Sequence, residues 1–155
     1  MKKILLLTSN YYPNASANGI CVHKVAEALI NIGYEVHLIS YGKYNEPKND
    51  EYKGIKVYRV RMPVYFQLSK FSLNINNLFI SNLLWRFARN LKRIKLLIYF
   101  PFYPVTSLIS VLKFLKLAKS LHKKHQFDVL VSSYNPIEGA ITGKYMKKKY
   151  NDLKF

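Results

Sequence analysis

The loop that follows the first apolar run carries the first residues that could bind a ligand. Lys3–Thr8 is a leucine-rich run without alternation, which is typical of a parallel strand covered on both faces, and the polar segment Ser9–Gly19 follows it. In open α/β sheets, ligands bind beyond the carboxyl ends of the strands. Asn18 and Gly19 lie where a helix should start, and the free N–H groups of a helix N-terminus favour an anion such as a diphosphate. The alternative is that both residues form only a turn and a helix cap.

A second polar group follows the apolar run Phe127–Ser132. It consists of Ser133, Tyr134 and Asn135. Because parallel strands end at the same edge of a sheet, these side chains should lie beside the first loop. They are the next candidates for a ligand site after the two residues of that loop.

The four histidines are interpreted as solvated or structural. His122 and His125 could bind a metal from adjacent helical turns, but no third ligand is apparent and two lysines lie between them. A solvated basic face is the favoured interpretation, and no metal site is predicted. His23 follows the first loop and could face a cleft, whereas His37 alternates within a strand. We expect a structural role for both.

Glycine patterns argue against two common nucleotide sites. The sequence has no G-x-G-x-x-G fingerprint, which argues against a nicotinamide dehydrogenase. Gly139, Gly143 and Lys144 resemble a phosphate-binding loop, but the spacing is one residue short and falls within a predicted helix.

The elements that must position the candidate residues are those of an α/β fold. Residues 3–40 read as strand, loop, helix, glycine and strand, which is a βαβ unit with a right-handed crossover. The predicted strands are Lys3–Thr8, Glu35–Ser40, Ile55–Arg61 and Phe127–Ser132. The predicted helices are Ile20–Ile32, at least two within residues 64–124, and Ile137–Tyr150. Tyr44–Lys53 should be a surface connection, and Asp152–Phe155 the start of a further strand. The fold class is therefore α/β, a parallel sheet flanked by helices, with a helical insertion.

Composition indicates one compact domain in a reducing compartment. A chain of 155 residues that is 50% hydrophobic can bury one sizeable core. The single cysteine, Cys21, excludes an internal disulfide framework, so a cytoplasmic setting is the simplest. Lys2 and Lys3 before Ile4–Leu7 resemble a secretory leader, but the apolar run ends at Thr8 and is better explained as a strand.

The net charge of +17 is unevenly distributed. No carboxylate lies between Glu51 and Asp128, and fifteen lysines and arginines fall in the same stretch. Such a surface must meet something anionic, and phosphate-bearing lipid headgroups and nucleic acid are the two candidates.

Two segments of this basic region have the pattern of amphipathic helices. Their cations are Arg86, Arg89 and Arg93 in the first segment, and Lys113, Lys116 and Lys119 in the second. Basic helices with an apolar, aromatic face are typical of a membrane surface. The alternative is two core-packed helices with a solvated basic face. Leu96–Leu112 is apolar for about the length of a short membrane span, but Pro101 and Pro104 break it, so we expect the chain to lie on a bilayer rather than cross it.

Three segments resemble the family-four glycosyltransferases. Residues 3–40 resemble the opening of that family: strand, proline loop, glycine, helix, Gly-Tyr-Glu-Val and strand. Gly54–Pro63, GIKVYRVRMP, is similar to the third-strand segment of the family, and Phe127–Pro136, FDVLVSSYNP, to its Phe-Asp-Val strand and proline loop. The strength of the resemblance comes from the order and spacing of these pieces, which cover nearly the whole chain.

The resemblance implies the N-terminal, acceptor-side half of a GT-B enzyme, in which two Rossmann-like domains face each other. Asn18 and Gly19 occupy the places of paired glycines near the donor phosphates, and Ser133, Tyr134 and Asn135 become candidates on the acceptor side. The donor-binding residues of the family belong to the second domain, so we predict no catalytic residue and no cofactor in residues 1–155, and an inactive chain on its own. A nucleotide-sugar is the donor expected for the complete enzyme.

The family further implies a membrane-linked acceptor such as a polyprenyl diphosphate, in surface-polysaccharide assembly at the inner face of the plasma membrane. The donor domain would belong to the same protein or to a separate chain. Two alternatives stay open. The basic charge also fits a nucleic-acid-binding module, although no helix-turn-helix, zinc or RNA-platform motif is recognisable. The chain could also be a non-catalytic subunit that anchors a separate transferase to the membrane.

Overall fold

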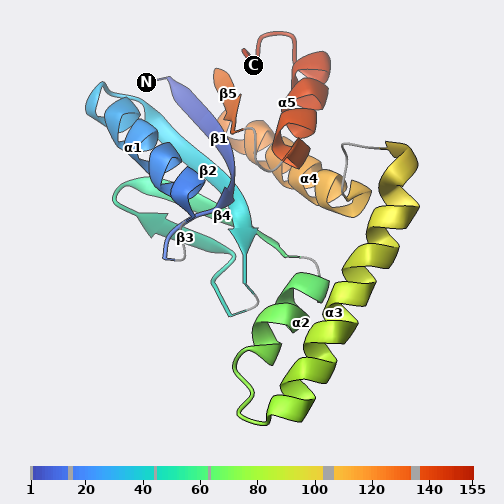
Figure 1. Ribbon diagram of the computed structural model, residues 1–155. Coiled ribbons are helices and arrows are strands. Elements are labelled where there is room, and N and C mark those ends of the chain that lie inside the picture. Colours follow the sequence, from blue (N-terminus) through green and yellow to red (C-terminus); the bar gives the residue numbers. More distant parts are fainter. Residues whose placement is uncertain (1, 14–15, 44, 63, 103–106, 134–136) are drawn as a thin grey trace.

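The computed structural model describes residues 2–13, 16–43, 45–62, 64–102, 107–133 and 137–155, and the sheet and its flanking helices form three layers (Figure 1). The strands are β1 (Lys3–Asn10), β2 (Glu35–Gly42), β3 (Asn49–Tyr52), β4 (Ile55–Arg61) and β5 (Val129–Ser132). The helices are α1 (Ala17–Asn31), α2 (Val64–Ser72), α3 (Leu78–Tyr99), α4 (Leu108–His125) and α5 (Ile137–Lys149), with a 3₁₀ turn, η1 (Phe100–Phe102), after α3.

The five strands form one mixed sheet in the order β3-β4-β2-β1-β5. β1 pairs in parallel with β2 and β5, and β2 pairs in parallel with β4. Only β3, at one edge, is antiparallel to its neighbour. The predicted α/β class is confirmed.

Alternating side chains of the strands fill two separate cores. Leu5 and Leu7 of β1 pack with Phe114 of α4, together with residues from α5. Ile4 and Leu6 point to the other face and join the core that contains α1. Both faces of the sheet are therefore covered, which explains why β1 reads as an unbroken apolar run.

Helix α1 has clear signals at both ends. Ser16 is the N-cap, and its side chain accepts a hydrogen bond from the backbone N–H of Gly19. At the other end, Gly33 has a φ of 89° and donates to the carbonyl of Ile30, while Tyr34 donates to that of Leu29. This pair of bonds is a Schellman motif, which requires a left-handed residue and so favours glycine there. The predicted cap at Gly33 is confirmed.

Helix α4 belongs to the core. Phe114, Ala118 and Leu121 on its inner side are buried against the sheet and α5. Of the predicted cations, Lys113 and Lys116 are exposed and Lys119 is half-buried. The structure therefore supports the core-packed alternative for this inner side, whereas Leu108, Ile109 and Leu112 at the start of the helix are exposed.

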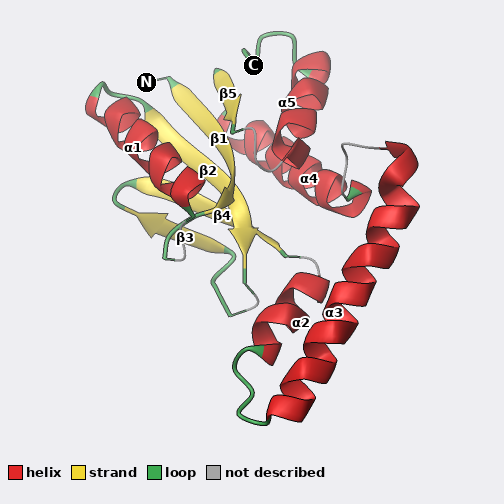
Figure 2. Ribbon diagram, in the orientation of Figure 1, coloured by secondary structure: helices red, strands yellow, loops and turns green. Residues whose placement is uncertain are grey.

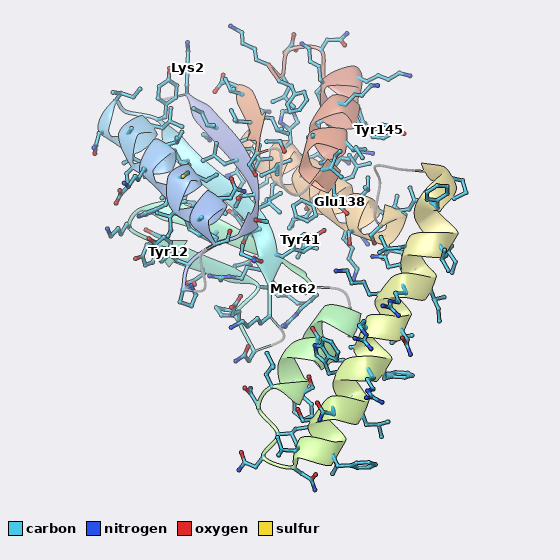
Figure 3. All side chains as sticks on the ribbon, in the orientation of Figure 1. Lys2, Tyr12, Tyr41, Met62, Glu138 and Tyr145 are labelled. Atoms are coloured by element: carbon cyan, nitrogen blue, oxygen red, sulfur yellow. The ribbon has the colours of Figure 1, made fainter. Side chains whose placement is uncertain are left out.

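Helices α2 and α3 form a hairpin that extends away from the sheet (Figure 2). Asn77 caps α3 by accepting from the N–H groups of Phe79 and Ile80. Side chains stand out from α3 along its whole length (Figure 3). Among the helices of the described residues, none combines the length and the apolar character that a membrane span needs.

Two features at the edges of the sheet differ from the prediction. Residues 49–52 form β3 rather than a plain surface connection, because the polar sequence NDEY pairs with β4 at the edge of the sheet. Near the end of the chain, Lys154 makes a single parallel bridge to Val129 of β5. The predicted further strand is thus present only as this first pairing.

Candidate functional site

The carboxyl ends of β1 and β5 form the topological switch point of the sheet. From β1, the chain reaches β2 through α1 on one face, whereas β5 lies on the other side of β1 and is reached after α4 on the opposite face. Loops that leave two adjacent strands in opposite directions open a crevice between them, where ligands of open α/β sheets bind. The candidate site is this edge.

Two of the predicted site residues meet here. The amide Nδ2 of Asn18 lies 3.2 Å from Oγ of Ser133, although the two residues are 115 positions apart. The same nitrogen lies 3.4 Å from Oγ1 of Thr8, which is fully buried near the end of β1. The backbone N–H of Ser133 donates to the carbonyl of Leu7, which fixes the start of the loop after β5 against β1. An amide and two hydroxyl groups therefore converge at the switch point.

Gly19 lies at this edge with a role that differs from the predicted one. The loop was expected to continue to Gly19, but α1 begins at Ala17, so Gly19 is buried in the first turn of the helix. Its N–H, expected to be free for an anion, lies 3.3 Å from the Ser16 hydroxyl. The N-cap was missed because Ser16 is not followed by the acidic residue of a capping box. Tyr134 and Asn135 lie outside the described residues.

Glu138 is a further polar residue near this edge that the sequence analysis missed. It lies in the first turn of α5 and is buried, and Figure 3 shows it at the end of the helix nearest α4. Burial lowers the pKa of Lys95 in α3, and the nearby Glu138 carboxylate opposes this shift. Lys95 of α3 thus lies within electrostatic reach of Glu138. A carboxylate that begins a helix just after Ser133 was the available signal.

A cluster of aromatic side chains supports the loop after β1. The hydroxyl of Tyr11 lies 2.6 Å from Nδ1 of His23, and Tyr12 stacks on Tyr52 with ring centroids 4.5 Å apart. Burial raises the pKa of the Tyr11 phenol, so this hydroxyl stays protonated and can donate a hydrogen bond to Nδ1 of His23. His23 is only 4% exposed, in line with its predicted structural role.

One cation of the basic region is a structural residue. Arg59 is buried, and its guanidinium donates to the carbonyls of Tyr12 and Pro47 at 2.8 and 3.1 Å. It also lies 2.9 Å from the Asp50 carboxylate and 3.6 Å from that of Glu46. Arg59 therefore ties the loop after β1 to the segment around β3. Counting it with the solvated cations was wrong.

Helix α3 carries the other predicted cations on an exposed surface. We define the exposed α3 face by Arg86, Arg89 and Arg93 together with Leu83, Phe87, Ile94, Leu97 and Ile98. Leu97 is 75% and Phe87 56% exposed, although both are large apolar side chains. The guanidinium of Arg89 lies 4.5 Å from the centroid of the Trp85 ring. An apolar stripe with arginines along one flank fits a partner that is both apolar and anionic.

Comparisons with known proteins identify the fold. No protein-family model matches the chain, and no curated protein matches it. A solved structure of sucrose-phosphate synthase from Thermosynechococcus elongatus is similar over 97% of this chain, with a TM-score of 0.59 and 15% identity. A second structure of that synthase matches over 96% with a TM-score of 0.50 and 14% identity. The chain spans 31% of the first matched chain and 59% of the second. Its mixed α/β fold is thus similar to a domain of a GT-B glycosyltransferase.

Proposed function

We propose that this chain is the acceptor-side domain of a GT-B glycosyltransferase related to family four. Such an enzyme transfers a sugar from a nucleotide-sugar, which a second Rossmann-like domain holds, to an acceptor on the first domain. The structural likeness, which runs over nearly the whole of this chain but only 31% of the synthase, supports the domain fold that this proposal assumes. Catalysis needs donor and acceptor held together, so the proposed transfer requires the second domain, in the same protein or in another chain.

The observation that carries the proposal is the meeting of Asn18 and Ser133 at the switch point of the sheet. Their amide and hydroxyl groups can hydrogen-bond the phosphate or hydroxyl oxygens of an acceptor. The backbone N–H groups at the start of α1 add positive partial charge at the same place. Within this proposal, residues 18 and 133 orient the acceptor, and we assign neither of them a chemical step.

The exposed α3 face supports a membrane-linked acceptor. Its arginines suit anionic headgroups, and its exposed apolar side chains suit the boundary between headgroups and acyl chains. In this proposal, a bilayer on the exposed α3 face holds the lipid-linked diphosphate on the acceptor side of the enzyme. The proposed acceptor is a polyprenyl-diphosphate-linked sugar used in surface-polysaccharide assembly, with the chain peripheral on the inner face of the plasma membrane.

Flotation of the purified chain with vesicles tests the membrane part of this function. We expect the chain to float with anionic vesicles at physiological salt and to stay bound when single-stranded or duplex nucleic acid is added. Apolar side chains that enter the interface give a component of binding that nucleic acid does not compete for. If the chain binds nucleic acid tightly and does not float with the vesicles, the result would contradict the proposal and favour a nucleic-acid-binding module.

A further inference from the structure

A polar cluster lies at the end of the sheet opposite the candidate site, where β2 begins. It consists of Glu35, His37 and His125. Glu35 and His37 lie at the start of β2, and His125 is the last residue of α4. One ligand atom from each side chain lies within 4.8 Å of the other two. The rings of His37 and His125 contact each other, with centroids 4.4 Å apart. Two imidazoles and a carboxylate are the donor set of several zinc sites.

The surroundings hold His37 in one orientation. The side chain is fully buried, with Nε2 lying 2.8 Å from Oε1 of Glu35 and Nδ1 lying 3.2 Å from the hydroxyl of Tyr58. The ring also stacks on Tyr58 and packs against Phe127. Metal-binding histidines typically have such a partner on the second ring nitrogen, which fixes the tautomer and the ring orientation.

The protonation states also suit a cation. Hydrogen bonds from Lys56 and His37 hold the pKa of Glu35 at about 2, so its carboxylate is ionised at neutral pH. Burial lowers the pKa of both His37 and His125, which favours the neutral imidazole that a metal requires. The carboxylate therefore supplies the negative charge, and each imidazole supplies a lone pair.

We propose that Glu35, His37 and His125 bind a divalent transition metal of the zinc class, with water in the fourth position. In the metal-free chain, Nε2–H of His37 donates to the ionised Glu35 carboxylate. Binding through Nε2 therefore requires a change of tautomer: Nε2 gives its proton to water, Nδ1 takes one from water and donates it to the Tyr58 hydroxyl, and the ring stays neutral with no net proton released. Ligands about 2.1 Å from a tetrahedral zinc lie about 3.4 Å apart. Rotation of the half-buried His125 side chain can close the remaining distance.

Lys56 competes with the metal for the carboxylate. Its Nζ lies 2.6 Å from Oε1 of Glu35, and the side chain is partly exposed, so it can swing into water when a metal binds. Lys3 also lies near Glu35, and Lys124 near His125. These positive charges weaken the site, so removal of Lys56 should strengthen metal binding. A merely structural ion pair would not produce this effect.

The proposed metal would join the end of α4 to the start of β2, away from Asn18 and Ser133. It is therefore independent of the acceptor site, and its failure would leave the proposed function untouched. In the sequence, His125 pairs with His122 as a possible metal ligand, and no third ligand is apparent. In the structure, Nδ1 of His122 instead accepts from the backbone N–H of Phe127, and the His122 ring packs against Tyr150.

Calorimetric titration of the metal-free chain with Zn²⁺ tests the proposal, with Co²⁺ absorption as a spectroscopic report on tetrahedral N and O ligands. The chain should bind one Zn²⁺. We expect His125→Gln to weaken Zn²⁺ binding by at least about tenfold. Loss of a residue that only hydrogen-bonds a metal ligand already weakens binding by about tenfold or more, and His125 is proposed as a ligand itself. Lys56→Met should strengthen it by about tenfold, because one cation beside the metal is removed. His122→Gln, on the same helix, is the matched control and should bind like the wild type.

Three results would overturn the proposal: no stoichiometric Zn²⁺ binding, an equal loss in His122→Gln, or unchanged affinity in Lys56→Met. Because His125 and Lys56 are not buried, both variants should fold, and circular dichroism checks this. Glu35→Gln keeps a hydrogen-bonding side chain but removes the charge, and it should weaken Zn²⁺ binding in the same direction as His125→Gln.

Discussion

Replacement of Arg59 by methionine should lower the free energy of unfolding by about 3 kcal/mol, at the lower end of the cost of breaking a buried ion pair. Methionine fills much of the volume but donates no hydrogen bond. The carbonyls of Tyr12 and Pro47 and the carboxylates of Glu46 and Asp50 would then lose a common donor. Asp50 is partly exposed and can turn to water, which keeps the loss from being larger. Chemical denaturation followed by circular dichroism measures the change.

Arg61→Met is the matched control for this experiment. Arg61 is half-buried on the same strand and donates to the carbonyl of Lys43. One hydrogen bond of this kind contributes about 1 kcal/mol, so the control should lose much less stability than the Arg59 variant. Equal and small losses in the two variants would contradict the account of Arg59 as a buried tie between the loop after β1 and β3.

The triple variant Arg86→Glu, Arg89→Glu and Arg93→Glu should bind anionic vesicles at least about a hundredfold more weakly than the wild type. Each basic side chain near an anionic membrane contributes about 1 kcal/mol, and the variant replaces three of them with repelled charges. All three positions are exposed, so the fold should be unchanged. Flotation over a range of lipid concentrations measures the affinity.

The control for this variant is Lys2→Glu, Lys24→Glu and Lys48→Glu, which changes the net charge equally at exposed positions outside α3. It should keep most of the binding. A second variant, Phe87→Gln with Leu97→Gln, leaves the charge unchanged and should remove the binding that survives high salt. Equal losses in both charge variants would show that net charge, rather than the exposed α3 face, attracts the chain to the vesicles.

Local patterns predicted much of this fold. The apolar runs located four strands, and Gly33 located the end of α1, because strand burial and helix capping depend on neighbouring residues. The contact between Asn18 and Ser133 could be anticipated in part, since adjacent parallel strands end at one edge. Strand β3 could not be predicted, because the polar sequence NDEY gains its strand conformation from pairing with β4.

Other features depend on long-range packing that no local pattern contains. Arg59 lies on the same buried face of β4 as Ile55 and Val57, so its burial could be inferred from the two-residue period of the strand. Its hydrogen-bonding and ionic partners could not be inferred, because they come from separate loops. The meeting of His37 with His125 joins residues from β2 and α4, which only the complete fold brings together. The different roles of α3 and α4 likewise depend on tertiary packing, since α4 packs against the sheet whereas α3 packs against α2.

Equilibrium binding to neutral vesicles with and without a polyprenyl-diphosphate-linked acceptor is the most direct test of the proposed acceptor site. Neutral lipid removes the attraction to anionic headgroups, but the acceptor itself carries a charged diphosphate, so its recognition is measured by comparing two variants of equal net charge. We expect the acceptor to increase binding. Asn18→Leu should reduce this increase by about tenfold, because the side chain loses its hydrogen bonds to a charged group. Asn31→Leu, at the exposed end of α1, is the control and should preserve the increase. Equal binding with and without the acceptor, or an increase that survives in Asn18→Leu, would contradict the proposed acceptor site.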